Sequence, residues 1–128
     1  MPVKKESRIL LALCLKDAQD IQCNYCIIAV LRGRHSLEEM LLCSKEELLS
    51  CFDKMKSLGE TLYTDNTSLG ILEKVLGDKI DDALRRLDLR VFPEGECPDL
   101  SDWYKFLGKL GVQVYKLCKN VRAYRSTK

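Results

Sequence analysis

Cysteine and histidine are the residue types in this chain that could ligate a metal or carry redox chemistry. Cys23 and Cys26 form a C-x-x-C pair, a spacing found in zinc sites and in thiol–disulfide exchange. No second C-x-x-C and no H-x-x-x-H completes a set of four ligands. His35 and Cys43 could complete such a set, so metal binding by the pair stays open. The favoured interpretation is two thiols on a packed face, with no metal and no cofactor.

Other arrangements that support catalysis are also hard to find. Residues 108–111 carry two glycines, but they lack the length and the preceding strand of a phosphate-binding loop. His35 is the only histidine and lies in an expected turn, so a Cys–His pair would need contacts that a sequence does not show. Asp78, Asp81 and Asp82 fall in the expected first turn of a helix, where carboxylates stabilise the helix dipole. The sequence therefore predicts a non-enzymatic chain.

The number and setting of the cysteines predict reduced thiols. Seven is an odd number, most of them fall inside apolar patterns, and no secretory signal is recognisable before them. We therefore expect unpaired thiols in a cytoplasmic or nuclear protein. No apolar run approaches the ~20 residues that span a bilayer. The residues concerned are Cys14, Cys23, Cys26, Cys43, Cys51, Cys97 and Cys118.

Composition indicates one globular domain with an uneven charge distribution. The chain has 128 residues, of which 46% are hydrophobic and 31% charged. Residues 1–102 carry 14 Lys and Arg against 19 Asp and Glu, a net charge of −5, whereas residues 103–128 carry seven basic residues and no acid. This asymmetry predicts that the basic segment docks on the body of the chain or on an acidic partner.

Apolar spacing and capping signals in residues 1–92 are read as six short helices. Ser36 and Ser44 are each followed by a glutamate three residues later, the pattern of a capping box, and Gly33 and Gly59 are suitable helix stops. Residues 87–92 could form a strand, but no strand partner is apparent. The expected helices cover residues 7–16, about 17–32, 37–42, 44–58, about 67–76 and 78–91.

A longer amphipathic helix is expected after a linker at residues 93–98, which contains two prolines and a glycine. It covers residues 99–124 and leaves a tail at 125–128. Its apolar stripe must be buried, either in cis against the bundle or in trans against another chain. The stripe consists of Trp103, Leu107, Leu110, Val114, Leu117 and Val121.

These elements predict an all-α fold, a six-helix antiparallel bundle with an additional C-terminal amphipathic helix. Residues 8–90 resemble the death-fold superfamily, and the death effector domain most. Residues 47–66 resemble that family's fourth helix and following loop. Residues 86–89, Arg-Leu-Asp-Leu, resemble its charge-triad motif, with Asp17 or Asp20 as the acid of the second helix. The motif departs from the family because it lies near the end of the expected sixth helix instead of its start.

The resemblance implies a protein-binding adaptor or regulator in apoptotic or innate immune signalling. It would act through homotypic association of helical domains, so its partners would be other helical-bundle proteins or itself. The alternative is binding of nucleic acid or anionic surfaces by the C-terminal helix, in which lysines and arginines interleave with aromatic residues. The candidate protein-interaction residues are Asp20, Asp81, Asp82, Arg85, Arg86 and Asp88.

Overall fold

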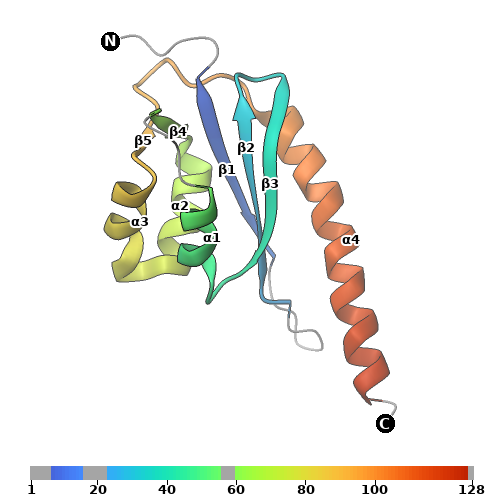
Figure 1. The fold of residues 1–128 in the computed structure, drawn as a ribbon. Helices are drawn as coiled ribbons and strands as arrows, with labels where there is room; N and C mark the ends of the chain where they lie inside the picture. Colours follow the sequence, from blue (N-terminus) through green and yellow to red (C-terminus); the bar gives the residue numbers. More distant parts are fainter. Residues whose placement is uncertain (1–6, 16–22, 56–59, 127–128) are drawn as a thin grey trace.

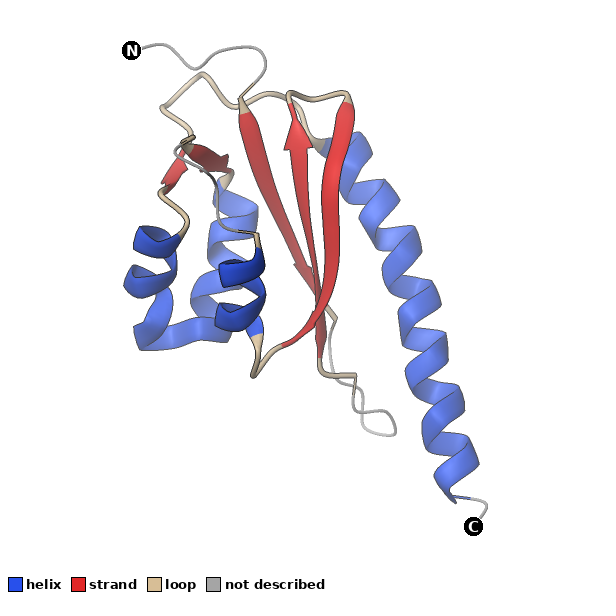
Figure 2. Ribbon diagram, viewed as in Figure 1, coloured by secondary structure: helices blue, strands red, loops and turns tan. Residues whose placement is uncertain are grey.

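A five-stranded mixed sheet forms the central layer of the fold (Figures 1 and 2). The structure is a computed structural model that describes residues 7–15, 23–55 and 60–126, with side chains of the last helix described through Cys118. The strands are β1 (Arg8–Cys14), β2 (Tyr25–Arg32), β3 (Ser36–Ser44), β4 (Leu62–Thr64) and β5 (Leu89–Val91). The helices are α1 (Leu48–Lys54), α2 (Asn66–Leu76), the 3-10 turn η1 (Gly77–Lys79), α3 (Ile80–Arg86) and α4 (Ser101–Ser126).

The strand order is β3-β2-β1-β4-β5. The first three strands form an antiparallel meander, whereas β4 lies parallel to β1 and β5 parallel to β4. Parallel neighbours need a crossover connection. The helix α1 lies in the connection from β3 to β4, which crosses over β2 and β1, and α2, η1 and α3 supply the crossover between the neighbours β4 and β5.

Helices cover both faces of the sheet, with α1, α2 and α3 on one side and α4 on the other (Figure 1). The first side contains the larger apolar cluster, in which Leu10 and Ile28 of the sheet meet Phe52 and Leu72 of the helices. On the second side, Leu11, Ala29 and Leu31 meet Leu107 of α4. The architecture is therefore a three-layer α/β/α arrangement.

The expected all-α six-helix bundle is wrong, and the death effector domain architecture that it implied is wrong with it, because the described residues contain this sheet. The expected helices at residues 7–16 and 17–32 fall largely on β1 and β2. Both strands have helices on both sides, so both of their faces are apolar. A strand buried on two faces reads as a continuous apolar run, without the alternation that distinguishes a strand from a helix.

The expected helix at residues 37–42 is also wrong, because Ser36 begins β3 and does not cap a helix. The register of β2 and β3 shifts between Val30 and Leu31, which leaves Glu38 as an extra residue in β3. The Glu38 carboxylate pairs with the guanidinium groups of Arg8 and Arg32, each at 3.1 Å. Residues 36–39, which match the Ser-x-x-Glu pattern through Glu39, therefore form the start of a bulged strand.

Local signals in the middle of the chain predicted helices that are present. The helix expected at about residues 67–76 is present as α2; Asp65 precedes it, and its side chain accepts a hydrogen bond from the Ser68 amide at 2.9 Å. Gly77 follows α2 with a positive φ of 55° and divides it from α3, as expected. The strand at residues 89–91, for which no partner was apparent, pairs with β4.

The helix α4 packs on the sheet in cis. Leu107 is fully buried, and Trp103 and Leu110 pack partly buried beside it. A Cβ at Gly111 would meet side-chain carbons of Leu15 and Leu13 at 3.0 and 3.5 Å, so this glycine allows the helix to approach the end of β1 closely. Of the other stripe residues, Val114 is half-buried, Leu117 is exposed, and the Val121 side chain lies outside the described residues.

No helix in the described ranges combines the length and apolar character needed to cross a membrane.

Six of the seven cysteines form disulfides, so the prediction of unpaired thiols is wrong for these six. The C-x-x-C cysteines are paired with different partners and do not form one redox or metal unit. Among the described residues, no group of three or more His, Cys, Asp or Glu is arranged to hold a metal ion. Disulfides are typical of oxidising compartments, which argues against the cytoplasmic or nuclear localisation that we expected. The pairs are Cys14–Cys26, Cys23–Cys118 and Cys43–Cys51, and Cys97 is free and exposed.

Candidate interaction surface

The strand β3 is the long edge of the sheet. It has nine residues and pairs with β2 alone in the strand order, whereas the opposite edge strand, β5, has three. An edge strand presents backbone N–H and C=O groups that can pair with another chain. The length of β3 therefore makes it the better of the two edges for docking an extended segment.

The hydrogen bonds between β2 and β3 establish which backbone groups of β3 point outward. The Lys45 amide donates to the Asn24 carbonyl at 3.0 Å, just beyond the paired strands. Inward and outward groups alternate along an antiparallel strand. The backbone groups of Leu41 and Cys43 therefore face β2, and those of Met40 and Leu42 face away from the sheet.

Three large apolar side chains of β3 are exposed on the side of the sheet that carries α4. Leu37, Met40 and Leu42 are 38%, 40% and 51% exposed. They stand opposite Leu31, Ala29 and Ile27 of β2, respectively, and these three belong to the apolar cluster under α4. Because paired residues share a face, the exposed side chains extend that apolar face beyond the edge of the helix.

The flank of α4 that faces β3 adds further apolar surface. The Trp103 indole N–H donates to the Arg34 carbonyl at 2.6 Å, in the turn between β2 and β3. Trp103 also packs edge-to-face against Phe106, with ring centroids 5.8 Å apart. Helical spacing places Phe106 and Leu117, which are 41% and 63% exposed, near the direction of Trp103. We call the exposed set the β3–α4 surface: Leu37, Met40, Leu42, Phe106 and Leu117.

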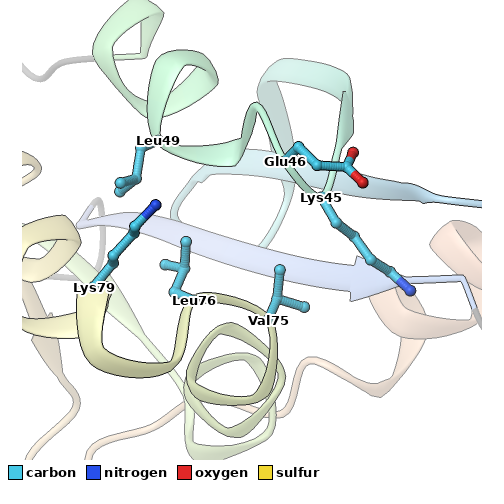
Figure 3. A pocket seen from close by; sticks show the side chains of 6 residues that line it. All are labelled: Lys45, Glu46, Leu49, Val75, Leu76 and Lys79. Atoms are coloured by element: carbon cyan, nitrogen blue, oxygen red, sulfur yellow. The ribbon is translucent and has the colours of Figure 1, made fainter.

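A shallow hollow of about 250 Å³ lies on the other side of the sheet, between the start of α1 and the end of α2. Figure 3 shows Lys45 and Lys79 at its two sides, with Val75 and Leu76 between them. Glu46 at its rim is engaged by the side-chain amide of Asn24. This volume is below the ~300–1,000 Å³ of typical ligand pockets, so the hollow gives little support to a small-molecule site.

A buried hydrogen-bond chain links α4 to the end of β4. The Ala12 amide donates to the Ser68 hydroxyl at 2.9 Å, and the Ser68 and Tyr104 hydroxyl oxygens are 2.7 Å apart. The Tyr104 hydroxyl donates to the Asp65 carboxylate, 2.6 Å from its Oδ1. The chain therefore runs from Ala12 through Ser68 and Tyr104 to Asp65, with each hydroxyl accepting one hydrogen bond and donating one.

This chain of groups supports structure better than it supports catalysis. Burial raises the pKa of Tyr104, and the hydrogen bond to Asp65 raises this pKa further, so the phenol stays protonated at neutral pH. Partial desolvation of the exposed Cys97 thiol and the nearby charge of Asp65 raise the pKa of this thiol, which disfavours the reactive thiolate. Among the described residues, no histidine or second carboxylate joins Asp65 as a general base.

We expect Tyr104→Phe to make the protein less stable near neutral pH by ~1 kcal/mol, because Asp65 and Ser68 lose a partner. In the wild type, the folded state keeps the phenol proton above pH ~10, where the unfolded state releases it. The free energy of unfolding should therefore fall as the pH rises past 10. The fall should be less than ~1.4 kcal/mol per pH unit, because Tyr104 is only half-buried. Urea unfolding at pH 8 and pH 11 tests this. A wild type that loses no more stability than the Phe variant would contradict it.

The charged residues selected from sequence lie mostly on α3, away from the β3–α4 surface. The guanidinium of Arg86 pairs with Asp53 of α1 at 2.8 Å and with Asp82 at 3.1 Å, so it joins two helices. Arg85 approaches Asp82 at 3.9 Å, and Asp81 is exposed. Asp88 accepts from the Thr61 hydroxyl at 3.1 Å. Asp20, like Asp17, lies outside the described residues. Their role in partner binding stays a prediction.

The sequence pattern does not identify the β3 residues of the surface, because residues 37–42 follow a capping-box pattern and are expected to be helical. Met40, Leu41 and Leu42 are all apolar, so this part of β3 shows no alternation of polar and apolar residues and could not be distinguished from a helical run. The bulge at Glu38 interrupts the alternation further. Phe106 was missed because it lies outside the stripe that packs on the sheet.

The comparisons with known proteins give no family. No family model, no curated protein and no solved structure matches this chain.

Proposed function

We propose that this chain is a non-enzymatic protein-interaction module that accepts an extended protein segment along β3. The observation that carries the proposal is a nine-residue edge strand whose outward backbone groups lie beside exposed Met40 and Leu42. Addition of a strand to such an edge gives affinity through backbone hydrogen bonds and specificity through alternate side chains. The segment that fits would present apolar side chains toward α4 at every second position.

Selection of short peptides displayed on phage tests this function. Peptides that bind the wild type should alternate apolar and polar residues. Leu42→Lys should weaken their binding ~10-fold or more, because it places a charge on the apolar β3–α4 surface. Val112→Lys is the matched control, because Val112 is 56% exposed on the solvent side of α4. Both changes should leave stability within ~0.5 kcal/mol. Peptides that bind the Leu42→Lys variant as well as the wild type would place the binding site elsewhere.

A second candidate is binding of an anionic macromolecule by α4. Lys105, Lys109 and Lys116 are exposed, and their spacing places them on the side of the helix opposite Leu107. A row of lysines on a helix is a footprint of phosphate binding. Binding of a generic oligonucleotide that weakens steeply with salt and ignores Leu42→Lys would favour this candidate.

A further inference from the structure

We propose that the segment that docks on β3 is the β3 strand of a second copy of this chain, so that two sheets join antiparallel about a two-fold axis. This inference rests on the proposed function and names the partner for the same site. The two-fold axis would pass beside Leu41, the middle of the apolar run at residues 40–42.

The backbone pattern of β3 is compatible with itself. In the two-fold arrangement, Met40 stands opposite the second copy's Leu42, and both residues point their N–H and C=O groups outward. Each such pair exchanges two hydrogen bonds, and the symmetry repeats the pair on the other side of the axis. Leu41, whose backbone groups are used by β2, stands opposite the second copy's Leu41 in a pair that needs no backbone hydrogen bond.

The side chains are complementary in the same register. Met40 and Leu42, 40% and 51% exposed in one chain, become cross-strand neighbours on the α4 side of the joined sheet. The two Leu41 side chains become neighbours on the opposite side, where Leu41 packs partly buried against the larger core cluster. A shift by two residues in one direction would instead place Leu42 opposite its own copy and leave Met40 opposite Ser44. The proposed register therefore covers both exposed residues of the run.

Charge is compatible with this register, but Glu39 would pair with the second copy's Lys45 directly if the sheets were centred on Leu42, so side-chain packing decides between these two registers. Glu39 stands diagonally across from the second copy's Lys45, a separation of ~7–8 Å between the residues that long side chains can bridge. The two-fold axis produces this pair twice. A register centred on Glu39 would instead oppose two carboxylates, which is unfavourable. Glu38 is held away from the edge by Arg8 and Arg32.

The test is the mass of the full oxidised chain, measured by sedimentation velocity and light scattering over a rising protein concentration. All samples carry Cys97→Ser, because Cys97 is exposed and could link two chains through a disulfide. We expect the mass to approach twice that of one chain. Leu42→Lys should weaken the dimer ~100-fold or more, because each dimer loses two apolar contacts. Val112→Lys should dimerise like the parent.

Leu42→Pro is a second variant that acts on the backbone. It removes an outward N–H and leaves the ladder with β2 intact, which is where an edge strand tolerates proline. It should give a monomer with the circular dichroism of the parent. A parent that stays monomeric at high concentration, or a dimer that survives in both Leu42 variants, overturns the proposal.

A charge exchange keeps the proposal testable should the Leu42 variants fold poorly. Glu39→Lys alone and Lys45→Glu alone should each weaken the dimer ~5-fold or more by opposing like charges, and the double exchange should restore it. Failure of the double exchange to restore the dimer overturns the register. Peptide binding that depends on Leu42, seen with a monomeric parent, would refute the second copy as partner and leave the proposed function standing. A parent that neither dimerises nor binds peptides through Leu42 would refute both the dimer and the proposed function.

Discussion

Removing the Cys23–Cys118 disulfide is expected to lower the free energy of unfolding by ~4–5 kcal/mol, because a cross-link of this span restricts the unfolded chain strongly. Its two cysteines are 95 residues apart in the sequence. The chain-entropy relation assigns ~4.7 kcal/mol to a loop of about 100 residues. The bond also lies within the small cluster in which Leu15 meets Val114 and Tyr115, so it holds α4 against the region that follows β1.

The variant is Cys23→Ala with Cys118→Ala, and urea unfolding is the measurement. The matched control is Cys43→Ala with Cys51→Ala, which removes a disulfide that spans only eight residues and should cost ~2.5 kcal/mol by the same relation. Equal losses in the two variants would show that loop length does not decide the effect.

Thiol titration of the denatured, unreduced wild type should find one free thiol, Cys97, and a count of seven would refute the disulfides themselves.

The sheet was not predictable from local sequence pattern, because it depends on pairing between segments that lie far apart in the sequence. The runs at Arg8–Cys14 and Tyr25–Arg32 are apolar on both faces, so their period gives no decision between strand and helix. Their partners make them strands: β2 pairs with β1 over the full length of β1, and β4 joins the other edge of β1 from more than 50 residues away. The three-residue strand β5 likewise depends on β4, which no local signal identifies.

Elements determined by local chemistry were predicted better. The helix α2 begins within one residue of the expected start, because the Asp65 side chain satisfies an amide that no helical carbonyl can reach. The helix α4 covers most of the expected residues, because apolar positions at steps of three and four specify one face over many turns. The exposed apolar set on β3 could not be recognised in the same way, since exposure at an edge depends on which strand stands beside it.

We expect Leu107→Asp to lower the free energy of unfolding by ~4 kcal/mol or more at neutral pH, because Leu107 is fully buried where α4 meets the sheet. Loss of a buried leucine side chain costs ~2–5 kcal/mol, and the new carboxylate would also have to lose its water. Burial raises the pKa of such a carboxyl group, so the variant should be less impaired at pH 4 than at pH 7. Val112→Asp, on the exposed side of the same helix, should change stability by no more than ~0.5 kcal/mol.

Trp103 makes the consequence of Leu107→Asp visible, since it is the only tryptophan and its indole N–H is bonded to the Arg34 carbonyl. If α4 leaves the sheet while β1, β2 and β3 stay paired, Trp103 emission should shift to longer wavelength at a lower urea concentration than the loss of far-ultraviolet dichroism. If α4 and the sheet unfold as one unit, the two signals should change together. We expect a single transition, because Ile9, Leu11 and Ala29 of the sheet lose their cover when α4 departs. Unfolding of the variant at the same urea concentration as Val112→Asp would contradict the packing of α4 on the sheet.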